Sequence, residues 1–256
     1  MSNQFSKAYT INIYDVDVNY RCKYASLMNY LWDVVVSQSD FLGETNAGII
    51  NHCVWVLLKY DLEIGEYPRF RETIIVETDI IGVRKLFGYR AFKIKNSKGH
   101  VIASGISTAM LIDIDSRRPV KVSPTQYHIY GIEKELEENI PLDDFLSMEN
   151  PKYVEHFKVR HSDIDMNRHV NNVKYIDMAV DALPEEILSA YEISNLKVLF
   201  KKEATKESSL RLVSEVIQDD TQHLMTVHQI FEKQEDKLLT KIELKWRRAI
   251  DSYDKL

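Results

Sequence analysis

The sequence predicts an α+β protein made of two tandem copies of one unit, each a long helix packed on a curled antiparallel sheet. The first observation is a repeat. The residues DVDVN at 15–19 return as DIDMN at 163–167, an offset of 163 − 15 = 148. The second observation is that an apolar helical pattern follows each copy, and about four strand-like segments follow each helical pattern. One helix against one antiparallel sheet is an α+β arrangement, and two units in one chain can protect each other's sheet edges.

In the first half, the segment YTINIY at 9–14 alternates like an edge strand. The helix is predicted from apolar residues spaced by three and four, which are Tyr24, Leu27, Met28, Leu31, Trp32, Val35 and Val36. The strands are predicted from segments rich in β-branched and aromatic residues, at 52–64, 71–81, 85–96 and 100–115.

In the second half, the alternating segment is HFKVRH at 156–161. A shorter helical pattern follows, closed by Pro184, with apolar residues at Val173, Ile176, Met178, Val180 and Leu183. Four strands are predicted at 191–202, 209–220, 223–233 and 238–248. The sequence between the halves is charged, carries prolines and is weakly helical. We therefore predict domains at 1–116 and 151–256, joined by a linker at 117–150.

Composition excludes several classes of protein. The chain has 256 residues, 45% of them hydrophobic and 28% charged, which is typical of a soluble globular protein. A formal net charge of -6 disfavours nucleic-acid binding. The sequence contains no apolar run long enough for a membrane span and no signal-peptide core, and its two cysteines fit a reducing cytoplasm. We expect no metal and no cofactor, because neither the cysteines nor the histidine spacings match a metal site.

The stretch HSDIDMNRHVNN, at 161–172, gathers polar groups just before the second helix. Asp165, Asn167 and His169 alternate there, so an extended segment would turn all three toward one pocket. A carboxylate, an imidazole and an amide at hydrogen-bond range can activate water. The N–H groups at the helix start, near Val170 and Asn171, are candidates for stabilising an oxyanion. The alternative is structural, because Asp and Asn are common helix caps and a lone histidine often only satisfies local hydrogen bonds.

The first copy of the motif separates these alternatives. Asp15, Asp17 and Asn19 persist, which indicates that this part of the motif builds the turn itself. Arg21 occupies the place of His169, and a guanidinium cannot act as a base near neutral pH. We expect the first half to be intact in structure and silent in catalysis.

Several stretches together resemble the acyl-acyl carrier protein thioesterases, which carry a double hotdog fold. The stretch that carries the resemblance best is DIDMNRHVNNVKYID. Three others are NHCVWVLLKYDLEIGEYPRFRETIIVET, ASGISTAMLIDIDSRRPVKV and the helical ASLMNYLWDVVVSQSDFLG. The resemblance extends from about Phe5 to Arg247, and the order of the motifs is specific.

The resemblance implies hydrolysis of fatty acyl thioesters on acyl carrier protein, with Asp165, Asn167 and His169 in the site. The family's further glutamate matches Glu203 in FKKEAT, but its neighbouring cysteine is replaced by Ala204. A Cys–His mechanism at this position is therefore excluded, and a carboxylate route remains. Asp165 would act as a base or as a nucleophile, and Glu203 would hold His169. The structural alternative for Glu203 is a salt bridge with one of the neighbouring lysines.

The resemblance also implies an acyl-chain site in the first half and an acidic carrier as partner. Candidate walls of that site, each of which could instead be ordinary core, are Met28, Leu31, Trp55, Leu57, Ile80 and Phe87. Candidate basic residues for docking the carrier are Arg117, Arg118, Lys201 and Lys202. A homodimer is compatible with this interpretation. Two alternatives stay open, namely an acyl-coenzyme A thioesterase of the same fold and a non-catalytic acyl-binding protein.

Overall fold

The computed structural model describes residues 4–43, 52–218 and 223–249. The chain divides into two compact units, Met1–Leu142 and Asp143–Leu256. Each unit contains a short edge strand, then a helix, then four further strands, so the predicted α+β class is confirmed. The edge strands, β1 and β6, begin and end three to four residues before the segments predicted at 9–14 and 156–161. The division differs from the predicted boundaries at 116 and 151, because the first part of the predicted linker belongs to the first unit.

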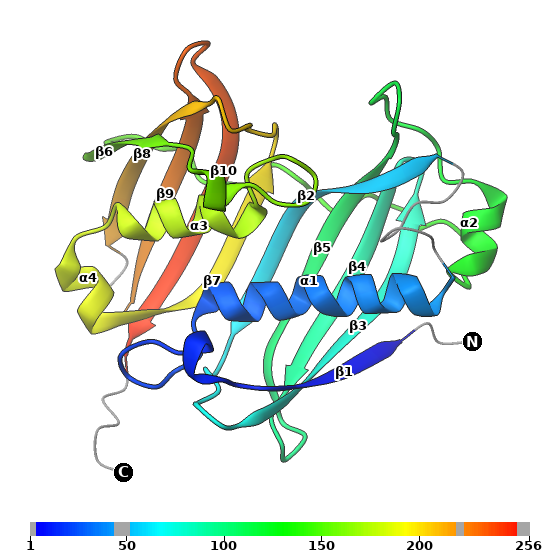
Figure 1. Cartoon of the computed structure of the whole chain (residues 1–256), viewed down its shortest axis with the longest axis horizontal. Helices are drawn as coiled ribbons and strands as arrows, with labels where there is room; N and C mark the ends of the chain where they lie inside the picture. Colours follow the sequence, from blue (N-terminus) through cyan, green and yellow to red (C-terminus); the bar gives the residue numbers. More distant parts are fainter. Residues whose placement is uncertain (1–3, 44–51, 219–222, 250–256) are drawn as a thin grey trace. The chain divides into compact units, whose positions relative to one another are not determined.

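The first unit is an antiparallel sheet with strand order β1-β3-β4-β5-β2 (Figure 1). Its elements are β1 (Phe5–Thr10), α1 (Tyr24–Phe41), β2 (Cys53–Ile64), β3 (Thr73–Arg84), β4 (Phe87–Lys95), β5 (Val101–Asp113) and α2 (Pro124–Ile129). These elements agree with the predicted segments to within a few residues at each end.

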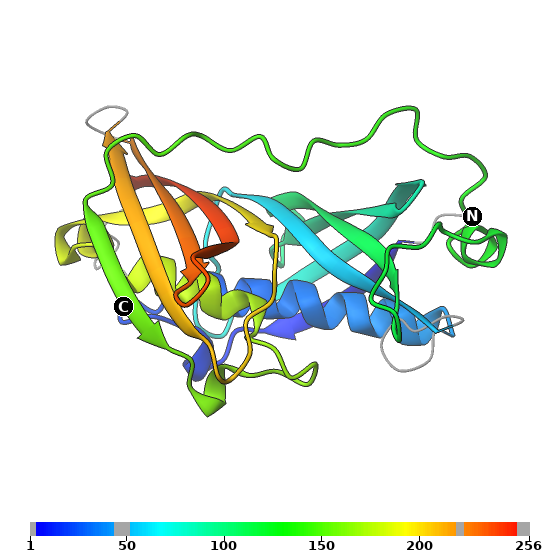
Figure 2. The same ribbon diagram turned by 90° about the horizontal axis from the view of Figure 1, so that it is seen from above.

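Helix α1 forms because its apolar residues recur on one face, and that face packs on the sheet (Figure 2). Leu27, Met28, Leu31 and Val34 are all at least 97% buried. The helix ends at Phe41, and the chain turns away at Gly43, whose φ of 76° lies in the left-handed region that an L side chain rarely adopts. The long helix therefore has one face committed to the core of its own unit.

The segment that follows β5 closes one end of the first unit. Ser123 caps α2, because its hydroxyl accepts a hydrogen bond from the Gln126 N–H at 3.3 Å. Beyond α2, the indole of Trp55 donates a hydrogen bond to the Tyr130 hydroxyl at 2.8 Å. The Trp55 bond ties the segment after α2 to β2, and Tyr127 of α2 packs against Val83 and Leu111 of the sheet.

The second unit repeats the arrangement with strand order β7-β10-β9-β8-β6. Its elements are β6 (Tyr153–Lys158), α3 (Asn172–Asp181), α4 (Glu185–Ala190), β7 (Tyr191–Phe200), β8 (Ser209–Gln218), β9 (His223–Glu232) and β10 (Lys237–Arg248). The last two residues of the strand predicted at 209–220 lie outside the described residues.

The interior of the second unit holds a chain of neutral polar groups. His228 on β9 is 1% exposed, with its Nδ1 2.7 Å from the Ser214 hydroxyl and its Nε2 2.8 Å from the Thr226 hydroxyl. The indole of Trp246 also donates to Thr226, at 2.9 Å. Burial lowers the pKa of His228 to about 3, so the imidazole is neutral in the folded protein. Among the described residues, no helix is long and apolar enough to cross a membrane.

Candidate active site in the second unit

The motif before α3 folds as a tight turn. Ile164 and Val170 form an isolated antiparallel bridge. Within it, the Asp165 N–H donates to the His169 carbonyl at 2.9 Å, and the Arg168 N–H donates to the Asp165 carbonyl at 3.0 Å. Arg168 takes a φ of 66° to close the turn. The expectation of an extended, alternating segment is therefore wrong, because the backbone folds back on itself between Asp165 and His169.

Asp163 anchors the start of this turn. Its carboxylate is 1% exposed, accepts the Arg160 N–H at 2.7 Å and pairs with the Arg160 guanidinium at 3.1 Å. Burial raises the pKa of this carboxyl, but the hydrogen bonds from Arg160 outweigh burial and the pKa is lowered overall. Asp163 is therefore a charged structural anchor of the turn.

Asp165 uses one carboxylate oxygen to hold the turn. Its Oδ1 accepts the Asn167 N–H at 2.8 Å. Its other oxygen, Oδ2, makes no hydrogen bond or ion pair with another described residue. The Asn167 side chain is exposed and likewise makes no hydrogen bond within the described part of the chain. Asp165 thus has one oxygen available to bind a water molecule or a substrate.

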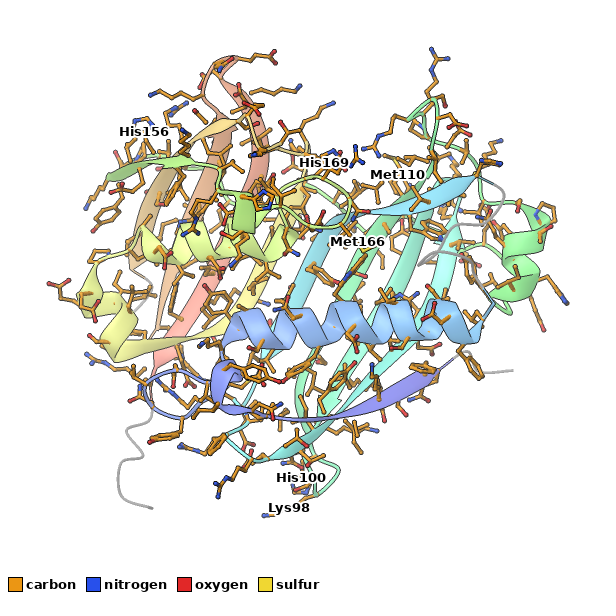
Figure 3. All side chains as sticks on the ribbon, viewed as in Figure 1. Lys98, His100, Met110, His156, Met166 and His169 are labelled. Carbon is orange, nitrogen blue, oxygen red and sulfur yellow. The ribbon has the colours of Figure 1, made fainter. Side chains whose placement is uncertain are left out.

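His169 and Glu203 are brought together from different elements. His169 lies in the loop that leads into α3 (Figure 3), whereas Glu203 follows β7. The imidazole Nε2 lies 3.3 Å from the Glu203 Oε2, and both side chains are partly exposed. Lys201, the candidate salt-bridge partner of Glu203 in the structural alternative, pairs with Asp143 at 3.1 Å.

Ala204 and Tyr175 support the His169–Glu203 pair through a contact that the sequence did not predict. Ala204 is 1% exposed; its carbonyl accepts the Val170 N–H at 2.9 Å, and its N–H donates to the Tyr175 hydroxyl at 2.9 Å. Tyr175, on α3, is 2% exposed. Its pKa is raised to about 12, chiefly by burial and further by the Glu203 and Asp165 carboxylates. Ala204 therefore links the turn to α3 and fixes the residue before it, Glu203.

The oxyanion expectation needs correction. The Val170 N–H is bound by Ala204, as above, and the Asn171 N–H donates to the Asp163 carbonyl at 2.8 Å. Both donors named from the sequence are thus already used inside the fold. Asn171 is instead the cap of α3, with its side-chain oxygen accepting the Val173 N–H at 2.9 Å. The N–H of Asn172, the first residue of α3, makes no hydrogen bond with another described residue.

The first unit contains the same turn with most of the same backbone hydrogen bonds. The Asp17 N–H donates to the Arg21 carbonyl at 2.8 Å, and the Asn19 N–H donates to the Asp17 Oδ1 at 2.8 Å. Tyr20 has a φ of 58°, like its counterpart Arg168. The Cys22 N–H binds the Pro68 carbonyl at 2.8 Å, as Val170 binds Ala204.

This equivalence shows what differs between the two copies. In the first, the Arg21 Nε lies 3.4 Å from the Asp17 Oδ2, so a cation occupies the oxygen that Asp165 keeps available. Because Pro68 matches Ala204, the residue that matches Glu203 is Tyr67. Sequence comparison could not have found this match, because its offset is 203 − 67 = 136 rather than 148.

A cavity of about 90 Å³ lies within the first unit, between α1 and the sheet. Three of the predicted wall residues line it, namely Trp55, Leu57 and Ile80. The other three do not: Met28 and Leu31 are buried core residues, and Phe87 lies away from the cavity lining. Lining residues that the sequence did not single out include Trp32, Val35, Ser39, Tyr60, Arg90, Ser107 and Tyr130.

The four basic residues proposed for carrier docking are all exposed. Arg117 and Arg118 follow β5 in the first unit, and Lys201 and Lys202 follow β7 in the second. Lys201 and Lys241 both pair with the Asp143 carboxylate. The negative charge of Asp143 weakens the positive potential that Lys201 presents to a carrier.

Neither cysteine is placed to act as a nucleophile. Cys22 and Cys53 both belong to the first unit, and burial raises the pKa of each thiol, that of Cys22 to about 12. Among the described residues, no group of three His, Cys, Asp or Glu side chains is arranged to hold a metal ion. The groups available for chemistry are therefore the Asp165 carboxylate and His169 imidazole of the turn, the Glu203 carboxylate beside them, and nearby amides.

A helix wrapped by a curled antiparallel sheet, present twice in one chain, defines a double hotdog protein. Two family models match the chain, the acyl-ACP thioesterase N-terminal domain over residues 2–130 and the acyl-ACP thioesterase C-terminal domain over residues 147–248. The chain therefore belongs to the acyl-ACP thioesterase family.

Individual relatives are distant in sequence but similar in fold. The chain is 24% identical over 238 residues to the chloroplastic oleoyl-acyl carrier protein thioesterase of Coriandrum sativum, covering 85% of this chain and 64% of that protein. The chain thus spans less than two thirds of the length of the curated plant relatives it matches first. The solved 12:0-ACP thioesterase of Umbellularia californica is 19% identical with a TM-score of 0.82, covering 96% of this chain and 95% of that one. A Lactobacillus plantarum structure assigned as an oleoyl thioesterase is 24% identical with a TM-score of 0.87, covering 98% of both chains.

Proposed function

We propose that this protein hydrolyses fatty acyl-acyl carrier protein thioesters, releasing the fatty acid and the carrier with its free phosphopantetheine thiol. Membership of the family supports the reaction class, and the names of the relatives support the carrier as substrate. The observation that carries the proposal is the difference between the two turns. In the first turn, Arg21 pairs with Asp17. In the second turn, His169 takes the place of that arginine and pairs with Glu203.

In this mechanism Asp165 is the group that acts on water. Its Oδ2 accepts a proton from a water molecule, and the water oxygen attacks the thioester carbonyl carbon. The tetrahedral intermediate then collapses with cleavage of the C–S bond. The hydroxyl stays on the acyl carbon, and the proton goes to the departing sulfur. Direct attack by the Asp165 carboxylate, followed by hydrolysis of the anhydride, is the alternative route through the same residue.

His169 and Glu203 act as a positioned pair beside Asp165. With its Oε2 3.3 Å from the imidazole Nε2, Glu203 is placed to accept the Nε2 proton and so to fix the ring orientation and its tautomer. The other ring nitrogen, Nδ1, is then left as an acceptor that orients the water or the thioester. Ala204 is buried, and both its N–H and its carbonyl form hydrogen bonds. The backbone next to Glu203 is therefore rigid, which fixes the position from which the Glu203 side chain extends.

With Val170 and Asn171 engaged, the oxyanion needs other donors. The Asn172 N–H stands at the positive end of the α3 dipole and has no partner among the described residues. The exposed side-chain amide of Asn167 is the second donor that we assign to this role. The first unit supplies the acyl-chain cavity, and the exposed arginines and lysines supply positive charge for an acidic carrier.

Thiol release from a panel of acyl carrier protein and coenzyme A thioesters of graded chain length tests the proposal. Asp165→Asn keeps the acceptor oxygen for the Asn167 N–H and removes the base, so turnover should fall by about 100-fold or more. The matched control is Asp17→Asn, the same change in the equivalent turn of the first unit, which should leave turnover near the wild-type value. Cys22→Ala and Cys53→Ala should both retain activity.

Each result has a clear consequence. Absence of thiol release from every thioester rejects the enzyme and leaves an acyl-binding protein. Higher kcat/KM for coenzyme A esters than for carrier esters replaces the carrier by coenzyme A. Equal losses in Asp165→Asn and Asp17→Asn would show that the aspartate only builds the turn.

A further inference from the structure

The cavity of the first unit is not uniformly apolar. Along the strands, it runs from the Trp55–Tyr130 pair past Leu57 and Ala109, whose backbones are paired across β2 and β5. It then meets a row of residues that are paired across four neighbouring strands. That row is Ile80 on β3, Arg90 on β4, Ser107 on β5 and Tyr60 on β2.

Three hydroxyl groups face this part of the cavity without a protein partner. Ser39 on α1 is 5% exposed, Tyr60 is 5% exposed and Ser107 is 6% exposed. None of the three side chains forms a hydrogen bond with another described residue. The three hydroxyl oxygens are not among the fully buried side-chain atoms that lack a partner, so they are accessible from the cavity and can hydrogen-bond to a group that fills it.

Arg90 adds a fixed cation to the same row. Its guanidinium donates to the Gln38 side-chain oxygen on α1 and to the Thr78 hydroxyl on β3, the latter at 3.1 Å. Both of these partners are 1% exposed, so buried groups fix the position of the guanidinium at the cavity wall. Burial raises the pKa of Tyr60 to about 12, so the phenol is a protonated donor at neutral pH.

A plain hydrocarbon chain fits this row poorly. Buried donors and acceptors that face methylene groups stay unpaired, which costs free energy, and any water that pairs them would have to be displaced by a group that cannot replace its hydrogen bonds. A chain that carries its own oxygen pairs with the hydroxyls instead. Sites built to hydrogen-bond a substrate hydroxyl discriminate strongly against the analogue that lacks it.

We propose that this cavity selects acyl chains that carry a hydroxyl group, which binds at the row formed by Ser39, Tyr60, Arg90 and Ser107. The inference deepens the proposed function and rests on it, since it names the acyl chain that the thioesterase takes. The apolar walls at Leu57 and Ile80 hold the hydrocarbon part of the chain.

The test compares dodecanoyl-acyl carrier protein with its monohydroxy isomers, in which the hydroxyl is placed on successive carbons up to the ω position. The full-length protein should hydrolyse the best hydroxy isomer with a kcat/KM at least ~10-fold above that of the plain dodecanoyl ester. Ser107→Ala and Ser39→Ala should each lower this ratio by about 5-fold, because each removes one hydrogen bond to the substrate hydroxyl.

Ser26→Ala is the matched control, because Ser26 is a buried serine of α1 that does not line the cavity. This variant should keep the wild-type ratio. A plain dodecanoyl ester that is hydrolysed as fast as every hydroxy isomer overturns the inference. So does a ratio that is unchanged in both Ser107→Ala and Ser39→Ala.

Calorimetric titration with free dodecanoic acid and the free hydroxydodecanoic acids separates this inference from the proposed function. Tighter binding of a hydroxy acid, together with no thiol release from any thioester, refutes the thioesterase and supports the selective cavity. Thiol release with equal binding of all the acids supports the thioesterase and refutes the selectivity.

Discussion

Lowering the pH should destabilise the second unit through one buried side chain, His228. Its imidazole is 1% exposed and is bonded only to neutral groups, the hydroxyls of Ser214 and Thr226. Burial alone lowers its pKa from 6.5 to about 3. In the unfolded chain the same imidazole takes up a proton below about pH 6.5.

The sign and size of the effect follow from proton linkage. Below pH 6.5 the unfolded state binds a proton that the folded state does not, so the free energy of unfolding falls as the pH falls. The contribution is complete above pH 6.5 and is lost progressively toward the folded pKa of about 3. At about pH 5 the loss spans roughly 1.5 pH units, which at about 1.36 kcal/mol per unit gives about 2 kcal/mol.

The chain offers a selective probe for this measurement. Of its three tryptophans, Trp32 and Trp55 lie in the first unit and Trp246 lies in the second. In a Trp32→Phe, Trp55→Phe background, urea unfolding followed by tryptophan fluorescence reports on the second unit alone. We expect its free energy of unfolding to be about 2 kcal/mol lower at pH 5 than at pH 8.

His228→Gln removes the titrating group and should abolish most of this pH difference, whatever its effect on stability at pH 8. His156→Gln, at an exposed position on the edge strand β6, is the control and should keep the wild-type pH difference (Figure 3). If His228→Gln and wild type lose the same free energy between pH 8 and pH 5, then His228 is not the group responsible and the reasoning from its burial is wrong.

Three further changes probe the site and the cavity. Glu203→Gln should lower kcat by about 10- to 100-fold, because an amide no longer fixes the orientation and tautomer of the His169 imidazole; an unchanged kcat contradicts the pairing. Tyr175→Phe removes the acceptor of the Ala204 N–H and should destabilise the second unit by about 1–3 kcal/mol in urea unfolding. Gly88→Ala places a Cβ 2.9 Å from the Trp55 indole, so it should shorten the preferred acyl chain; an unaltered chain-length profile would show that Trp55 does not bound the chain.

Periodicity and repetition were enough to predict the fold. The three- and four-residue spacing of apolar side chains placed α1, and β-branched segments placed the strands to within a few residues. These signals are local, and each is repeated in the second half of the chain. What local signals could not supply was the path of the backbone between Asp165 and His169, which depends on a left-handed residue, Arg168, that no spacing rule identifies.

The candidate site was only partly accessible from sequence for the same reason. The pairing of His169 with Glu203 joins residues 203 − 169 = 34 positions apart, and only the resemblance to a family suggested it. The engagement of the Val170 and Asn171 amides was missed because helix-start donors were assumed to be free. In fact, the turn that positions the aspartate also consumes them.

The two units show how duplication can divide binding from chemistry. A row of residues crosses four strands in each sheet, Ile80–Arg90–Ser107–Tyr60 in the first unit and Ser214–His228–Ile242–Val198 in the second. In the second row Ser214 and His228 hydrogen-bond to each other, and the aliphatic residues are at least 99% buried. In the first row the hydroxyls are unpaired within the described chain and border a cavity.

In the turns, by contrast, it is the second unit that has an available polar group. The first unit neutralises its aspartate with Arg21, whereas the second keeps an oxygen of Asp165 available and adds the His169–Glu203 pair. Both units hold an equivalent turn, so the difference lies in the side chains on it, and the unit with the cavity can accept a chain without having to support catalytic groups. Arg21→His in the first unit should therefore give no second active site, because Tyr67 stands where a glutamate is needed to orient the new imidazole. Turnover in a combined Asp165→Asn, Arg21→His variant should stay as low as in Asp165→Asn alone. A recovery of thiol release would show that the turn by itself is sufficient for catalysis.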